Sequence, residues 1–131
     1  MTKKLWGSRF PKKTTALADK FTSSISFDKR LAKYDILGSI AHAKMLGIQR
    51  IIPLKDASLI AKGLNSILKD AVNGKLKFDP KAEDIHSNIQ DVLIKRIGQV
   101  AHKLHTARSR NDQIALDVRM YTKDEMEEML D

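Results

Sequence analysis

Apolar residues recur at every third or fourth position through most of this chain, and this spacing constrains the fold more than any other feature. Such a period places apolar side chains on one face of a helix, where a neighbouring helix can cover them. The spacing predicts helices over residues 29–46, 55–72, 83–97 and 109–131. Residues 21–27 alternate between polar and apolar types and residues 75–78 form a short linker or strand, but both are too brief to indicate a sheet. The expected fold class is therefore all-α.

The first and last of these helices have identifiable apolar faces. In the first, the expected face consists of Leu31, Tyr34, Leu37, Ala41 and Met45. In the last, it consists of Ala115, Val118, Thr122, Met126 and Met129. Asp28 is suited to cap the start of the first helix, and Gly47 is placed to end it. The last pattern has a weak, methionine-rich face and no stop signal before Asp131, so we expect that helix to be interrupted rather than finished.

Composition limits the class of protein and its compartment. A length of 131 residues suits one domain, or one domain with a piece of another. The chain has no cysteine, which excludes a disulfide framework and thiolate metal ligands and suits a reducing compartment. No uncharged apolar run approaches the roughly 20 residues that cross a bilayer, and no apolar run follows the N-terminal lysines as in a secretory signal. We expect a cytoplasmic protein without a membrane partner.

The net charge of +8 is unevenly distributed along the sequence. Residues 1–55 carry +9, residues 56–110 carry +4 and residues 111–131 carry −5. Such asymmetry can indicate a nucleic-acid footprint. Here, however, the basic residues are dispersed, and the aromatic residues are not interleaved with them as a base-stacking surface requires. Most lysines are therefore interpreted as solvated helix faces, and nucleic acid is not expected as a partner.

The stretch HTARSRNDQ, residues 105–113, is the strongest candidate for a binding site. It contains two arginines and an asparagine, Arg108, Arg110 and Asn111. Ser109 followed three positions later by Asp112 matches the signature of a helix N-terminus, with Ser109 as the cap. Free backbone N–H groups, the positive end of a helix dipole and two guanidinium groups together favour a carboxylate or phosphate. The alternative is an ordinary helix cap beside two solvated arginines.

Three other features could carry chemistry, and each has a simpler structural explanation. The hydroxyl groups of residues 22–26 precede a helix and could serve only as caps. Asp84 and His86 lie at a helix start, but their spacing points them to different sides, which does not suit a metal pair. His102 and His105 have helical ligand spacing but no acidic residue beside them. We therefore predict no metal site.

Four segments together resemble the N-terminal region of the argininosuccinate lyases, a family of the fumarase/aspartase superfamily that includes the delta crystallins. They are LWGSRF, FTSSISFDKRL, EDIHSNI and KLHTARSRNDQ, and they occur in the family's order across essentially the whole chain. The resemblance implies an N-terminal helical domain over residues 1–107. It also implies the beginning of the first long helix of a central helical bundle over residues 108–131.

The resemblance further implies an activity and an assembly. Argininosuccinate lyases cleave argininosuccinate to arginine and fumarate by β-elimination, without a cofactor, in a homotetramer whose sites combine several subunits. The family's Thr-His pair and its Gly-Ser-Ser-x-Met-Pro loop with the catalytic serine do not occur in these 131 residues. We therefore expect no catalytic residue here, with the acid–base groups downstream, and no activity from this chain alone.

The same resemblance assigns roles to individual residues. Ser24 and Asn111 are expected to bind the substrate, with Arg110 and His86 lining the site, and Asp28 and Asp84 to orient their neighbours by hydrogen bonding. Independently of the resemblance, the residues of the HTARSRNDQ stretch predict that Arg108 also contacts the substrate and that Ser109 and Asp112 support the helix start. An anionic elimination intermediate needs such positioned donors and fixed positive potential.

Three positions depart from the family pattern, namely Ser8, Gln90 and Ala107. Ser8 stands where a second glycine usually follows the tryptophan, and Gln90 where glutamate is expected. Ala107 replaces a glycine, which would cost stability if the backbone there requires a positive φ.

Two alternatives remain at the level of sequence. Within the superfamily the alternative is adenylosuccinate lyase, against which RSRNDQ argues. Outside catalysis, the alternatives are a crystallin-like relative and a basic nucleic-acid-binding helical module.

Overall fold

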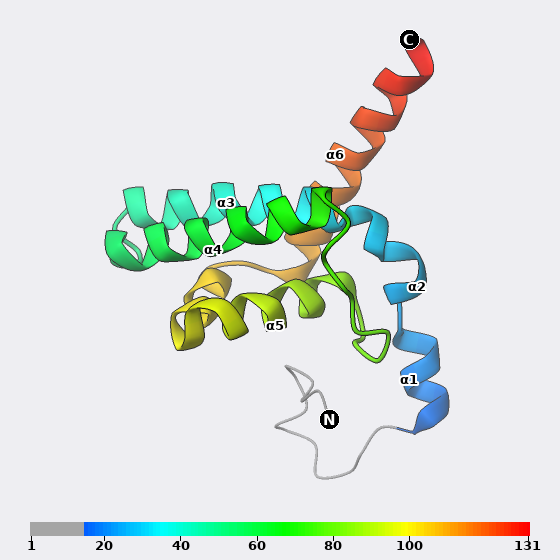
Figure 1. Ribbon diagram of the computed structural model, residues 1–131, viewed down its shortest axis with the longest axis horizontal. Helices are drawn as coiled ribbons and strands as arrows, with labels where there is room; N and C mark the ends of the chain where they lie inside the picture. Colours follow the sequence, from blue (N-terminus) through cyan, green and yellow to red (C-terminus); the bar gives the residue numbers. More distant parts are fainter. Residues whose placement is uncertain (1–14) are drawn as a thin grey trace.

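The computed structural model describes residues 15–131, and its regular elements are all helical (Figure 1). The α-helices are α1 (Ala16–Thr22), α2 (Ile25–Asp28), α3 (Ala32–Ile48), α4 (Leu54–Val72), α5 (Ile85–Ile97) and α6 (Arg110–Leu130). Two 3-10 helices are η2 (Lys29–Leu31) and η3 (Gly98–His105). Over these residues there is no β-strand, so the all-α prediction is confirmed.

Helices α3 and α4 form an antiparallel hairpin, with α5 lying along it and η3 returning the chain toward α6 (Figure 1). The core lies between these elements, because the apolar faces of α3, α4 and α5 meet there. Its fully buried side chains include Ile36, Leu46, Ile60, Leu64, Ile67, Ile85 and Leu93. Helix α6 starts against α3 and then projects away from the body of the molecule (Figure 1).

The four long helices occur where the apolar spacing predicted them, with ends displaced by only a few residues. The alternating stretch at residues 21–27 contains the end of α1 and most of α2, and residues 75–78 form no strand. Gly47 does not end α3, which continues to Ile48. Instead a Cβ on Gly47 would lie 2.6 Å from the Cβ of Ala57, so this glycine allows α4 to approach α3 closely.

The apolar faces predicted for α3 and α6 are partly wrong. Ala41 and Met45 are exposed, and α3 instead turns Ala32, Ile36, Ala43 and Leu46 toward the core. On α6 the predicted face is exposed, while its two buried residues are Gln113 and Asp117. Apolar spacing missed the buried face of α6 because the residues on that face are polar.

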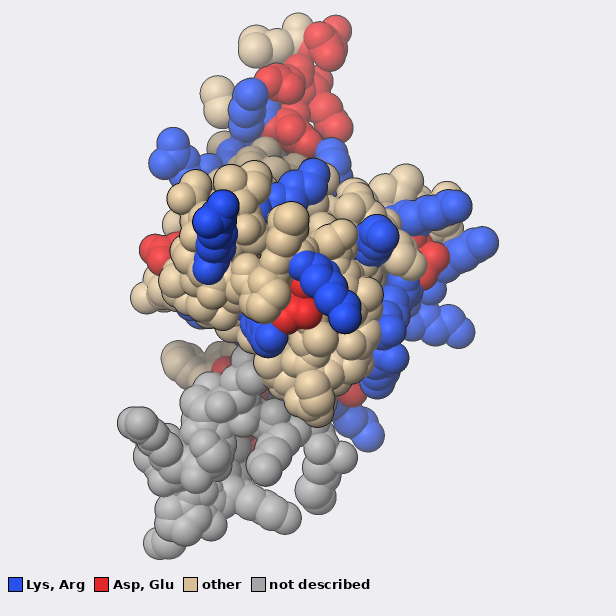
Figure 2. Space-filling model, turned by 90° about the vertical axis from the view of Figure 1, so that its left-hand side faces the viewer, with Lys and Arg blue, Asp and Glu red and all other residues tan. Residues whose placement is uncertain are grey.

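Charge on the surface follows the distribution in the sequence. Figure 2 shows Lys and Arg side chains spread over the body of the molecule, with acidic side chains gathered on the projecting end of α6. Over the residues that the structure describes, no helix is both long and apolar enough to cross a membrane.

Candidate functional site

The candidate site lies where the N-termini of α5 and α6 meet the first half of α3. Asp84 caps α5, because its Oδ1 accepts a hydrogen bond of 2.7 Å from the Ser87 amide. Ser109 caps α6 as predicted, and its Oγ accepts a 3.1 Å hydrogen bond from the Asn111 amide. Both helices therefore direct the positive ends of their dipoles toward one region.

The segment before α3 is tied to the start of α5 through two of the predicted residues. The Ser24 hydroxyl donates a 2.6 Å hydrogen bond to Asp28 Oδ2, and the same oxygen accepts a 3.1 Å bond from the Ile85 amide. The Ser24 amide also donates to the Glu83 carbonyl over 2.8 Å. Asp28 was predicted to cap the helix that follows it, but its side chain makes no such bond and instead holds the first amide of α5.

A chain of polar side chains links α3, α5 and α6. The Arg110 guanidinium donates a 2.9 Å hydrogen bond to Gln113 Oε1, and Gln113 Nε2 donates to Asp35 Oδ1. His86 Nδ1 lies 3.1 Å from the same Asp35 oxygen. Arg110 Nε also lies 3.7 Å from Asp84 Oδ2, so Arg110 contacts the N-cap residue of α5 as well.

Two buried carboxyl groups of this cluster have opposite pKa shifts. Burial by itself would raise the pKa of Asp35, but hydrogen bonds from His86 and Gln113 and the charges of His86 and Arg108 outweigh it, so the pKa is lowered. Burial and the neighbouring Asp35 charge raise the pKa of Asp117 to about 7. Neither oxygen of Asp117 has a hydrogen-bond partner among the described residues. As pH rises, Asp35 therefore ionises before Asp117.

Arg108 is directed into the interior rather than toward the surface. Its NH1 donates a 2.8 Å hydrogen bond to Ser39 Oγ on α3, and burial lowers the pKa of its guanidinium. His105 lies nearby, and burial together with the charges of Arg110 and Arg108 lowers the pKa of its imidazole to about 4. His105 is thus neutral at physiological pH, and Arg108 carries the positive charge beside the acidic pair.

Asn111 and Asp112 differ from the residues above because both are exposed. The Asn111 side chain makes no hydrogen bond to any residue in 15–131, so its amide group is free to meet a ligand. No bond from Asp112 returns to the Ser109 amide in that part of the chain, so a full reciprocal capping box is not formed.

The only group of metal-ligand type found among residues 15–131 is Asp35, His86 and Asp117, whose ligand atoms lie within 4.8 Å of one another. Asp35 Oδ1 is already engaged by His86 and Gln113, and Arg108 supplies positive charge. We interpret the group as a hydrogen-bonded cluster. The absence of a metal site stays a prediction.

The sequence analysis assigned no role to Asp35 or Asp117, and it included Gln113 only as the last residue of the HTARSRNDQ stretch. A signal was available in their spacing. Asp35 and Ser39 on α3, and Gln113 and Asp117 on α6, are each four residues apart and therefore share a helix face. Two such polar pairs on helices that pack together indicate a buried polar contact.

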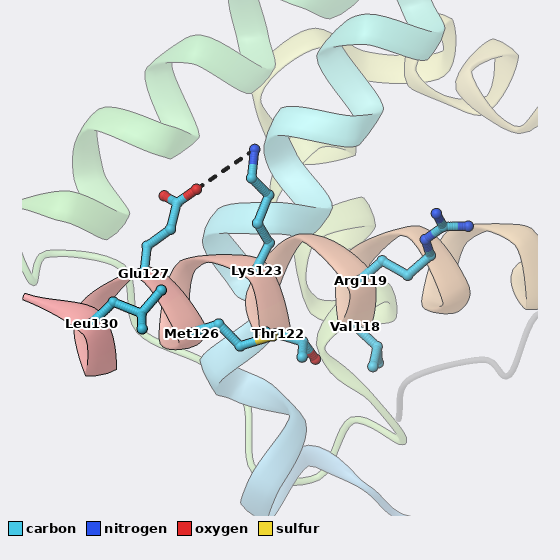
Figure 3. A pocket seen from close by; sticks show the side chains of 7 residues that line it. All are labelled: Val118, Arg119, Thr122, Lys123, Met126, Glu127 and Leu130. Carbon is cyan, nitrogen blue, oxygen red and sulfur yellow. Dashed lines mark ion pairs between the residues drawn. The ribbon is translucent and has the colours of Figure 1, made fainter.

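A shallow hollow on the outer face of α6 is a separate feature (Figure 3). Its lining side chains are Val118, Arg119, Thr122, Lys123, Met126, Glu127 and Leu130. All seven belong to one helix, and Lys123 Nζ and Glu127 Oε1 form an exposed ion pair of 3.7 Å across its edge. None of the predicted site residues lines this hollow.

A sequence model of the lyase family matches residues 8–131 of this chain. The chain belongs to the lyase family. Among the curated relatives of this lyase chain, the argininosuccinate lyase of Pelotomaculum thermopropionicum is 57% identical over 126 residues, which are 96% of this chain and 27% of that protein. The argininosuccinate lyase of Acetivibrio thermocellus is 59% identical over 96% of this chain and 28% of its own length. That of Heliobacterium mobile is 57% identical over 98% and 28%, respectively.

These matches confirm the resemblance to the argininosuccinate lyases, and this lyase chain spans only 27% to 28% of the length of those three relatives.

Two of the three positions that depart from the family pattern lie among the described residues. Ala107 has φ 55°, so the position does require the left-handed region that glycine adopts more easily. Gln90 is buried, and both polar atoms of its amide lack a partner among the described residues. Ser8 lies outside the residues that the structure describes.

Proposed function

We propose that this segment supplies substrate-binding groups to an argininosuccinate lyase, which cleaves argininosuccinate to arginine and fumarate by β-elimination. The observation that carries the proposal is the convergence of Asp84, His86 and Arg110 at the N-termini of α5 and α6. Ser24 joins them through Asp28 and the first amide of α5.

The chemistry of these groups suits the proposed substrate. Argininosuccinate carries three carboxylates and a guanidinium, and proton removal beside a carboxylate generates further negative charge. Arg110 and the first amides of α6 can stabilise that charge because they are fixed before the reaction, and the free amide of Asn111 can add a further donor. Asp84 lies 3.7 Å from Arg110 and can bind the cationic part of the substrate. Asp28 and Ser24 hold the start of α5 in place beside it.

The proton-transferring groups are proposed to come from outside residues 1–131, and we propose that the sites are shared among subunits of a homotetramer. Residues 1–107 would form the N-terminal domain, and residues 108–131 would begin a helix of the central bundle. The enzyme would be cytoplasmic and would need no cofactor. Accordingly, we expect the 131-residue chain alone to release no fumarate from argininosuccinate, as followed by ultraviolet absorbance; turnover above background would show that the catalytic groups are misplaced.

The proposal is tested by replacing Asn111 with leucine in the full-length enzyme. Asn111→Leu removes a donor from an exposed side chain that makes no internal hydrogen bond, so the fold and assembly should persist. A hydrogen bond to a charged group contributes about 1.5–3 kcal/mol, so kcat/KM should fall by about ten- to more than a hundredfold.

Ser109→Ala, two positions before Asn111, is the matched control. It removes the cap bond to the Asn111 amide, which should lower stability by about 1 kcal/mol and affect the melting temperature more than kcat/KM. If Asn111→Leu instead lowers stability and spares kcat/KM, this stretch is only a helix cap and the proposed binding role is wrong.

A further inference from the structure

Asp35 is a buried carboxylate on α3 that contacts side chains from two other helices. It is 1% exposed, and its Oδ1 accepts from Gln113 Nε2 of α6 and lies 3.1 Å from His86 Nδ1 of α5. We propose that Asp35 is a positioning residue of the candidate site, which holds His86 in one tautomer and orientation and, through Gln113, fixes Arg110. The proposal rests on the proposed function, because His86 and Arg110 are the residues that it makes effective.

The first consequence concerns which nitrogen of His86 carries a proton. A carboxylate can only accept a hydrogen bond, so Nδ1 of His86 must be the donor to Asp35. The lowered pKa of Asp35 keeps that carboxyl ionised at neutral pH. Nε2 of His86 makes no hydrogen bond to any of residues 15–131, so it is the ring nitrogen available to a ligand. The arrangement is that of an orienting carboxylate behind an imidazole.

The second consequence concerns Arg110. Because Gln113 donates its Nε2 hydrogen to Asp35, the amide oxygen must point the other way, where it accepts from Arg110 NH1 at 2.9 Å. Arg110 Nε is held from a second direction by Asp84 Oδ2 at 3.7 Å. One carboxylate on α3 therefore determines the orientation of two side chains on α5 and α6 that are proposed to meet the substrate.

Asp117 provides a matched comparison within the same cluster. It is fully buried and its Oδ2 lies 3.7 Å from His86 Nδ1, but neither oxygen accepts a hydrogen bond among the described residues. The other charged or titratable groups around the pair are Arg108, from the segment before α6, and His105 of η3. If any buried carboxyl beside His86 sufficed, Asp35 and Asp117 would be equivalent.

The experiment compares Asp35→Asn with Asp117→Asn in the full-length enzyme. Both changes are isosteric, but only Asp35→Asn removes the negative charge from the group that accepts hydrogen bonds from His86 and Gln113. We expect Asp35→Asn to lower kcat/KM by about ten- to a hundredfold, the size expected for a hydrogen bond to a charged group. Asp117→Asn should leave kcat/KM largely unchanged. Restoring the carboxylate one methylene further away in Asp35→Glu should recover part of the loss.

A spectroscopic measurement separates positioning from mere stability. Nitrogen-15 NMR of the His86 ring should show a protonated Nδ1 bound to a carboxylate in the wild type and in Asp117→Asn. In Asp35→Asn the Nδ1 signal should shift toward the other tautomer or a mixture. In a His86→Gln background, Asp35→Asn should cost less than it does alone, because part of its effect passes through His86.

Several outcomes would overturn the inference or the proposed function separately. The positioning role would be rejected if a folded Asp35→Asn variant kept both its kcat/KM and its His86 tautomer. The proposed function would still stand in that case, provided that the wild-type enzyme releases fumarate. A wild-type enzyme that releases no fumarate would reject the proposed function, and the NMR comparison would still decide whether Asp35 holds His86.

If Asp35→Asn does not fold, Gln113→Met tests the same chain of contacts without removing a charge. It should lower kcat/KM by about two- to tenfold by releasing Arg110, because the effect on the substrate is indirect and about the size of a typical net intramolecular hydrogen bond. A folded Gln113→Met enzyme with full kcat/KM would reject the connection between Asp35 and Arg110.

Discussion

Helix α3 packs against α4 on one side and α6 on another, and the two contacts differ in chemistry. The contact with α4 is apolar and close, since Gly47 lets Ala57 approach and Ile60, Leu64 and Ile67 are fully buried. The contact with α6 consists largely of hydrogen bonds and ion pairs. Asp35 contacts Gln113, and Lys33 and Tyr34 contact Asp124. Just before α6, Arg108 donates to Ser39 of α3.

The difference separates stability from positioning. Apolar burial stabilises a fold without specifying where any charged group points. A buried polar network contributes little net stability, or costs some, but it fixes its members in direction because each donor needs one acceptor. The α3–α4 contact therefore serves as the rigid base. The α3–α6 contact fixes the HTARSRNDQ stretch relative to α5, where the candidate site lies.

The largest expected effect is a difference in stability between two leucine truncations, one on α4 and one on α6, the helices on either side of α3. Leu64→Ala removes a fully buried side chain of α4 and should lower the free energy of unfolding by about 2–5 kcal/mol. Leu116→Ala, on α6 and 42% exposed, should cost about 1 kcal/mol or less. Chemical denaturation of both variants measures the contrast. Equal losses would show that the two contacts do not differ as described.

The next effect concerns pH and the buried pair on the α6 side. The raised pKa of Asp117, about 7 against an ordinary 3.8, means that the unfolded chain loses this proton first as pH rises. The folded state is therefore disfavoured progressively from about pH 4 to pH 7, and the full cost is present above pH 7. Asp117→Asn should remove that cost and stabilise the protein at pH 8 by roughly 2–4 kcal/mol.

A matched pH comparison sharpens this prediction. The lowered pKa of His105, about 4 against 6.5, destabilises the fold as pH falls from about 6.5 to 4, which opposes the Asp117 effect over the same range. Wild-type stability should therefore vary little there, whereas Asp117→Asn should become distinctly less stable toward pH 4. Denaturation curves at several pH values decide it. A variant with the wild-type profile would show that Asp117 is ionised throughout.

The smallest effect lies in the link that leads into α6. Ala107 has φ 55°, where a Cβ causes strain that glycine does not have. Ala107→Gly should stabilise the folded chain by about 0.5–1 kcal/mol through relief of this strain. The greater conformational entropy of glycine in the unfolded chain offsets part of that gain. Thermal unfolding measures it, with Ala115→Gly on the exposed face of α6 as a control that should be destabilising. If both glycines destabilise, the left-handed conformation of Ala107 carries no appreciable strain.

The amino-acid sequence by itself determined the helices, because a period of three to four apolar residues is a local property that needs no partner. The Ser109 cap was predictable for the same reason, since a hydroxyl reaches the amides of its own first turn. The family resemblance predicted a glycine at position 107, and the positive φ of Ala107 shows the local backbone conformation that favours glycine there.

Only the tertiary structure decided which polar residues are buried and which side chains they hydrogen-bond to. Asp35 and Gln113 are 78 positions apart, and nothing local to either indicates that one accepts a hydrogen bond from the other. The apolar pattern of α6 was misleading because this helix turns Gln113 and Asp117 toward α3 and leaves Val118 and Met126 outside. Burial of a charged group depends on compensating partners from other helices, and such partners are brought together only by folding.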